Sequence, residues 1–233
     1  MRTDALPSYM LGLRFFSRIL LAPPEADLLR PILQERLWQD LRAWACFACP
    51  PGGAEEFDPQ AAIDRLNAAY TAPASASTSL PPLEDGTLDA LLLELRLDHL
   101  ALFSGPTPKA APWESVWRER DKLLFGEQTE KVRQAYLDWN LDTEASGREP
   151  EDHLGLEMAF ALFLLQAVSQ NPPPRSRRGL TPEAALAVFL DAHILAWAGP
   201  CLQTAGQNAA TVFYRETAPL CLLLLRNLRR ELD

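Results

Sequence analysis

Residues 154–168 read LGLEMAFALFLLQAV, and this stretch decides the fold class. Its apolar residues cover nearly every face of a helical wheel, with no alternation of the kind a half-buried strand shows. A helix that is apolar all round must lie at the centre of a folded protein. The same property recurs in APLCLLLL, residues 218–225. We therefore expect both segments to form central helices of an all-α protein.

The rest of the chain predicts amphipathic helices around this centre, because apolar residues recur every three or four positions. The helices are expected at about 9–20, 26–44, 59–70, 88–103, 113–125, 127–139, 150–168, 182–197 and 208–233. Proline-rich segments predict loops at about 72–86, 104–112 and 171–181. Together these features predict a single all-helical domain over residues 1–233, a mostly antiparallel helical bundle.

The net charge indicates the kind of partner that the protein binds, and the cysteine content indicates its cellular compartment. The chain has 233 residues and a net charge of −9, from 22 basic and 31 acidic side chains. A nucleic-acid-binding protein is expected to be basic, so the balance favours a basic partner. Four cysteines in a chain of this length favour the reducing cytoplasm. Arg14 and Arg18 interrupt the apolar N-terminal stretch, and no segment has about 18 uninterrupted apolar residues, so neither a signal peptide nor a membrane span is predicted.

The sequence offers little for catalysis. It contains no phosphate-binding GxxxxGK[ST] loop, no HExxH and no GxSxG motif. Cys46 and Cys49 have the spacing of metal ligands but stand alone, and a structural zinc site needs four ligands. His99, His153 and His193 are far apart in sequence. The favoured interpretation is a protein that is not an enzyme and binds no cofactor or metal; the alternative is a metal- or nucleotide-dependent enzyme using these cysteines and histidines.

Residues 113–120 read WESVWRER. On one continuous helix, Trp113, Trp117, Arg120 and Leu124 share a stripe. The tryptophans can fill the core while Arg120 covers them, and burial is the commoner fate of such residues. Alternatively, they form a recognition surface, since tryptophan and arginine are enriched at binding hot spots.

Residues 149–153 read EPEDH and precede the most apolar helix. A structural interpretation is that Pro150 begins the helix and that Glu151 and Asp152 stabilise its first turn. A functional interpretation is that the carboxylates, together with a histidine beside apolar surface, bind arginine side chains bidentately. The residues alone leave both open.

Two further features lie in the C-terminal half. His193 and Trp197 are one helical turn apart and either fill the core or line a groove near the EPEDH segment. Arg175, Arg177 and Arg178 follow three prolines, which predicts a solvated, mobile segment.

The order of these motifs resembles the TorD/DmsD family of redox enzyme maturation proteins. The resemblance rests on LFSGP at 102–106, PWESVW at 112–117, LFG at 124–126, EPEDHLG at 149–155, and His193 with Trp197. It implies an all-helical cytoplasmic chaperone that binds the twin-arginine signal peptide of an exported molybdoenzyme of the DMSO or TMAO reductase type. Such a chaperone supports cofactor insertion before export.

The resemblance also implies a peptide-binding site and partners. Its residues are His99, Leu102, Phe103, Pro106, Trp113, Trp117, Arg120, Phe125, Glu149, Pro150, Glu151, Asp152, His153, His193 and Trp197. The implied partners are the leader and precursor of a molybdenum-containing reductase and the twin-arginine translocase, with no nucleic acid. We expect the carboxylates to bind the leader's arginines and the aromatic side chains its apolar stretch. A nitrate-reductase-type assembly chaperone, and either a monomer or a domain-swapped dimer, also fit.

Overall fold

The computed structural model describes residues 5–34, 44–48, 57–70, 85–121, 124–141 and 149–233, and within them the chain is helical with no β-strand. The all-α fold class is therefore confirmed. The helices are α1 (Leu6–Leu21), α2 (Ala26–Gln34), η2 (Ala45–Phe47), α4 (Pro59–Tyr70), α5 (Asp85–His99), η3 (Leu100–Ser104), α6 (Glu114–Arg118), α7 (Glu127–Asp138), α8 (Leu154–Val168), α9 (Pro182–Phe189), η5 (Leu190–Ile194), α10 (Leu195–Asn208) and α11 (Val212–Arg230).

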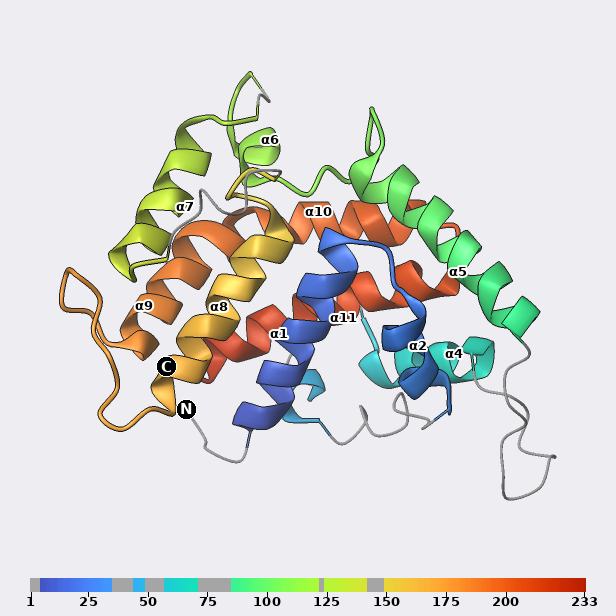
Figure 1. Ribbon diagram of the computed structural model, residues 1–233, viewed down its shortest axis with the longest axis horizontal. Coiled ribbons are helices and arrows are strands. Elements are labelled where there is room, and N and C mark those ends of the chain that lie inside the picture. The colour runs from blue at the N-terminus through green and yellow to red at the C-terminus, as the bar shows by residue number, and fades with distance from the viewer. Residues whose placement is uncertain (1–4, 35–43, 49–56, 71–84, 122–123, 142–148) are drawn as a thin grey trace.

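Two antiparallel helix pairs form the centre, α1 with α8 and α10 with α11 (Figure 1). The start of α8 meets the end of α1, where the Ser17 hydroxyl donates to the Gly155 carbonyl at 2.7 Å. A Cβ atom on Gly155 would lie 2.5 Å from Leu21 Cγ, so glycine permits this close approach. Gly206, near the end of α10, likewise lies beside Arg215 near the start of α11.

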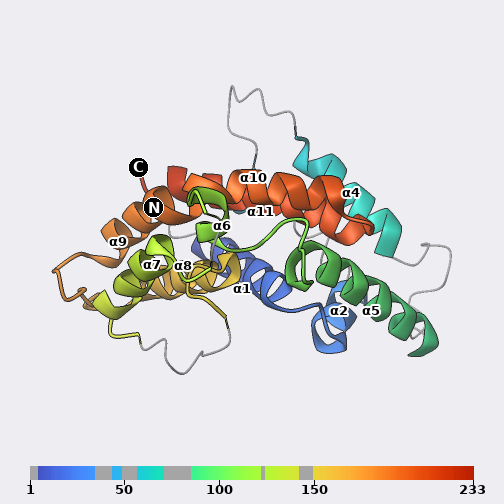
Figure 2. The same cartoon turned by 90° about the horizontal axis from the view of Figure 1, so that it is seen from above.

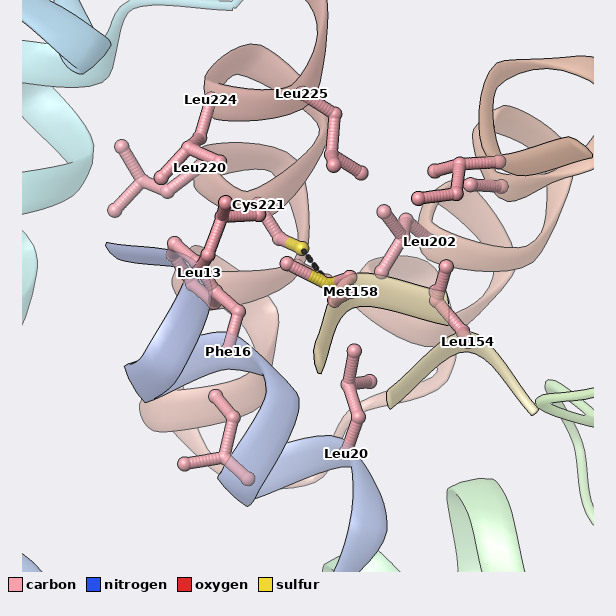
Figure 3. Packing of buried hydrophobic residues seen from close by; sticks show 14 of the residues in the cluster. Leu13, Phe16, Leu20, Leu154, Met158, Leu202, Leu220, Cys221, Leu224 and Leu225 are labelled. Carbon is pink, nitrogen blue, oxygen red and sulfur yellow. Dashed lines mark hydrogen bonds between the residues drawn. The ribbon is translucent and has the colours of Figure 1, made fainter. Parts of the chain in front are cut away.

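The two segments predicted to be central are central. Met158 of α8 and Cys221 of α11 meet in the middle of the core, with a sulfur–sulfur distance of 3.7 Å (Figure 3). Leu13 and Phe16 of α1 pack against them and are fully buried. Burying a leucine or phenylalanine side chain contributes roughly 1.5–3 kcal/mol, so these residues add to the stability of the core.

The amphipathic helices lie at the two ends of this centre. Figure 2 shows α7 and α9 at one end of the molecule, α2, α4 and α5 at the other, and α6 between them on the side of α7. At the second end, Asp58 caps α4 as the Asp-Pro pair predicts, since its Oδ1 accepts from the backbone N–H of Gln60 at 2.9 Å. The predicted continuation of α2 through residues 35–43, and nearly all of the predicted loop 72–86, lie outside the described residues.

The predicted helix over 113–125 is wrong, because α6 ends at Arg118. The backbone of Glu119 is extended, with φ −92° and ψ 145°. Its carboxylate accepts from the backbone N–H of Gln128 at 2.8 Å and so caps the start of α7. Arg120 therefore does not share a helical stripe with Trp117.

Two other helix limits differ from the prediction. Pro150 does not begin α8; residues 150–153 form a turn, in which the His153 N–H donates to the Pro150 carbonyl at 3.1 Å. The helix predicted to end near Trp197 instead continues to Asn208 with Pro200 inside it. One face of α10 is buried against α11, and this burial outweighs the hydrogen bond that proline removes.

The continuous helical run Pro182–Asn208 is the one described segment long and apolar enough to cross a membrane by length and composition. Half of its most apolar window is buried inside the structure. The core helix of a folded protein meets the same criteria.

Candidate functional site

Asp152 of the EPEDH segment caps α6, the helix that the WESVW segment forms, and so links the two segments. It is fully buried, and its Oδ2 accepts from the Ser115 backbone N–H at 2.8 Å at the start of α6. Its Oδ1 accepts from the Thr129 hydroxyl at 2.9 Å, and its carbonyl accepts from the Glu114 N–H at 2.9 Å. The carboxylate therefore holds α6 and α7 in place and is not open to an incoming guanidinium group. Asp152 thus stabilises the start of a helix, as the structural interpretation of the EPEDH segment has it. That helix is α6, however, and not α8, which follows Asp152 in the sequence.

His153 caps the start of α8. Its Nδ1 accepts from the Gly155 backbone N–H at 3.0 Å, so its proton is on Nε2. Burial, together with a smaller effect of the nearby His99, lowers the pKa of His153 to about 3. The ring stands edge-on to Trp113, with centroids 5.8 Å apart. His153 is therefore a neutral structural residue at physiological pH.

The other two carboxylates of the EPEDH segment differ in exposure. Glu151 is buried and accepts from Arg133 Nε of α7 at 2.8 Å. The Tyr136 hydroxyl donates to the Glu151 carbonyl at 3.0 Å. Glu149 is exposed. Of the three carboxylates expected to edge a groove, Glu149 is the one facing solvent, and peptide binding by the segment stays a prediction.

Two buried glutamates at the centre of this region were missed as site residues. Glu114 lies in the WESVW segment and pairs with Arg118 and with His193, whose Nδ1 is 2.9 Å from Glu114 Oε2. Glu157 lies in the first turn of α8, and its Oε2 accepts from Trp197 Nε1 at 3.2 Å. Its Oε1 has no hydrogen-bonding donor among the described residues. The signal that could have found Glu157 is its position inside an otherwise apolar helix.

The environment of Glu157 disfavours the ionised form of its carboxyl group. Its complete burial raises the pKa of the Glu157 carboxyl well above the ordinary value, and the neighbouring charges of Glu114 and Asp152 raise it further. Burial also raises the pKa of Tyr136, which faces the same carboxylates.

His193 and Trp197 have separate roles. Trp197 is almost fully buried and belongs to the core. The His193 side chain is 12% exposed and packs on Phe189, with ring centroids 4.9 Å apart. His193 therefore sits where the buried cluster opens to the surface.

The remaining predicted site residues divide into core and surface. His99, Leu102 and Phe103 are buried; His99 Nε2 donates to the Leu20 carbonyl at 3.2 Å, and burial lowers its pKa. Pro150 is buried as well. Trp113 and Trp117 are half-buried, whereas the exposed residues are Pro106, Arg120 and Phe125.

The described part of the chain contains no group of three histidine, cysteine or acidic side chains placed to hold an ion. Cys46 is buried, and burial raises the pKa of its thiol to about 12. Cys49 lies outside the described residues.

An apolar cleft of about 430 Å³ opens between α7 and α9. Aromatic side chains line it, namely Trp139, Phe160 and Phe189, with His193 also in its lining. A second cleft of about 260 Å³ lies beside α1 and α2.

The chain is similar to a protein-family model and to several known chaperones. Residues 67–203 match the family model described as nitrate reductase delta subunit. The Tat proofreading chaperone DmsD of Salmonella typhimurium is 30% identical over 132 residues, which cover 56% of this chain and 58% of that protein. The chaperone protein TorD of Vibrio cholerae is 28% identical over 142 residues, which cover 60% of this chain and 63% of that protein. The matched part thus spans about three fifths of each relative.

Proposed function

Because this chain belongs to the nitrate reductase delta subunit family, with relatives of the TorD/DmsD type, we propose that it is a maturation chaperone of an exported molybdoenzyme. It acts in the cytoplasm, binds the twin-arginine leader of a DMSO or TMAO reductase type precursor, and holds the precursor until its cofactor is inserted. It performs no catalysis itself.

The observation that carries the proposal is the convergence of the two motif segments. Trp113 and His153 form an isolated antiparallel backbone bridge, and Asp152 caps α6 from 37 residues away in sequence. The motif residues thus build one junction of α6, α7 and α8, from which partly exposed aromatic side chains and Glu149 reach the surface. A fixed junction of this kind suits recognition, since a preorganised site loses less entropy on binding.

The chemistry of a twin-arginine leader matches this end of the molecule. Two adjacent arginines seek carboxylates, and the apolar stretch after them seeks an apolar surface. The chain carries a net charge of −9, which favours the approach of a basic peptide. Because Glu151 and Asp152 are already paired, Glu149 is the carboxylate of the motif available to a leader arginine.

Glu149→Lys should raise the Kd for a synthetic twin-arginine leader, measured by calorimetric titration, by about fivefold at low salt. A surface charge pair is worth up to about 1 kcal/mol, and reversing the charge replaces attraction with repulsion. The effect should shrink at 0.5 M salt because the Debye length falls to a few ångströms.

Glu94→Lys is the matched control, since Glu94 is exposed and lies on α5 at the opposite end of the molecule. It changes the net charge equally and should leave the Kd within about twofold of the unmodified chain. Equal effects of the two variants would contradict a local role for Glu149. No binding of any leader by the unmodified chain would contradict the proposed function.

The family model's own description favours a second client class, a nitrate reductase. The same titration discriminates between the two clients when leaders of both reductase classes are compared. Stoichiometric metal in the purified protein would instead support the enzymatic alternative.

A further inference from the structure

The loop between α8 and α9 contains a basic pair followed by an apolar residue, in the sequence Ser176-Arg177-Arg178-Gly179-Leu180. The predicted solvated segment is exposed at Arg175, Arg177 and Arg178, and hydrogen bonds join it to the end of α7. The Arg177 N–H donates to the Asp138 carbonyl at 2.8 Å, and the Arg178 N–H donates to Asp138 Oδ1 at 3.1 Å.

Side-chain contacts complete this attachment. Arg177 Nε donates to Asn140 Oδ1 at 2.9 Å. The Ser176 N–H donates to the Leu180 carbonyl at 3.1 Å, which closes the loop into a compact turn. The five residues 176–180 are hereafter called the basic turn.

The basic turn borders the apolar cleft between α7 and α9. Leu180 and Arg178 both line this cleft. The Arg178 guanidinium is 3.9 Å from Asp138 and remains 74% exposed, so it is only loosely held. An apolar residue at the cleft and an arginine at its acidic edge are thus the two features that a twin-arginine leader would present.

We propose that the cleft between α7 and α9 binds the apolar stretch of a twin-arginine leader, and that the basic turn occupies the place of the leader's arginines until the leader displaces it. This inference rests on the proposed function and adds to it a site and a built-in competitor. The occupant is a peptide with a basic pair followed by apolar residues.

Charge and shape support this occupant. Glu130, Lys131, Asp138 and Arg178 are the charged residues of the cleft lining, so displacement of the basic turn leaves two carboxylates against one lysine. A leader guanidinium could then pair with Asp138 in a bidentate manner. The cleft volume of about 430 Å³ lies within the range of about 300–1,000 Å³ usual for ligand sites.

The cleft is also continuous with the motif junction. His193 lines the cleft and pairs with Glu114 of the WESVW segment at 2.9 Å. Arg133 of α7 pairs with Glu151 of the EPEDH segment. The motif residues therefore position both walls of the cleft even where they do not face it.

The first test weakens the competitor. Arg177→Ala combined with Arg178→Ala should lower the Kd for a twin-arginine leader by about fivefold, because the fraction of molecules with an open site rises. Arg96→Ala combined with Arg226→Ala is the control, since both residues are exposed and the change in net charge is the same. The control should show a smaller change than the basic-turn variant.

The second test fills the cleft. Val188 lines the cleft and is 58% exposed, so Val188→Trp should leave the fold intact and raise the Kd about tenfold or more by occupying the apolar site. Leu93→Trp, at a 55% exposed position on α5, is the matched control and should leave the Kd unchanged.

The outcomes separate this inference from the proposed function. In one outcome, the unmodified chain binds the leader tightly while neither the basic-turn variant nor Val188→Trp changes the Kd more than its control does. That result would overturn the cleft assignment and leave the proposed function standing. Failure of the unmodified chain to bind any leader would overturn both. A lower Kd for the basic-turn variant together with a higher Kd for Val188→Trp is the result that supports the inference.

Discussion

Asp152→Ala should lower the free energy of unfolding by about 3 kcal/mol, the sum of a lost helix cap at about 1 kcal/mol and a buried hydroxyl left without an acceptor at about 2 kcal/mol. The cap is that of α6 and the hydroxyl is that of Thr129, which is buried. Denaturant unfolding followed by the helical circular dichroism signal measures this change.

Two variants control for this result. Asp152→Asn keeps the shape of the side chain and a carbonyl oxygen that accepts from the Ser115 N–H. Its amide group can donate to the Thr129 hydroxyl oxygen. This variant should therefore lower the free energy of unfolding by about 1 kcal/mol or less. Asp89→Ala, an exposed acid on α5, should change stability by no more than about 0.5 kcal/mol. Unfolding of Asp152→Ala at the same denaturant concentration as the unmodified chain would contradict the capping role.

Glu157→Gln should make the protein more stable than the unmodified chain at pH 8, and the difference should grow as the pH rises. The glutamine is a neutral isostere of the protonated glutamate that the fold holds beside Glu114 and Trp197. Burial raises the pKa of Glu157 in the folded chain well above its ordinary value of 4.5.

The direction follows from proton binding in the two states. Above pH 4.5 the unfolded chain releases the Glu157 proton while the folded chain keeps it. The folded state then binds more protons, so stability from this group is complete below pH 4.5 and falls by up to about 1.4 kcal/mol per pH unit until the folded pKa is reached. Glutamine does not titrate, so Glu157→Gln removes this dependence of the unfolding free energy on pH.

The measurement is the difference in unfolding free energy between the variant and the unmodified chain from pH 5 to 8. Groups whose pKa values are the same in both proteins contribute equally to the two unfolding free energies, so their contributions cancel in this difference. Glu94→Gln, at an exposed position, should give a flat difference over the same range. A flat difference for Glu157→Gln as well would contradict a protonated Glu157.

The sequence predicted the parts of the fold that depend on local pattern. The apolar runs in α8 and α11 identified the core, and Asp58 before Pro59 located the start of α4. These features depend on side-chain periodicity and on hydrogen bonds within three residues, so neighbouring residues suffice to predict them.

The features that the sequence missed depend on contacts between distant segments. α6 ends early because Glu119 caps α7, and α10 continues past Pro200 because α11 covers it. Asp152 is predictable as a helix-terminal acid, but the backbone N–H that it caps, that of Ser115, lies 37 residues earlier in the sequence. Pattern alone could not distinguish a carboxylate that binds an arginine from one that binds a backbone amide.

Hydrogen–deuterium exchange with and without a saturating twin-arginine leader tests the central claim most directly. The account predicts slower amide exchange in α6, α7 and α9 when the leader is bound, and unchanged exchange in α4 and α5 at the opposite end of the molecule. Slower exchange confined to α4 and α5, or no change in any segment, would contradict leader recognition by the junction of α6, α7 and α8 and its adjoining cleft.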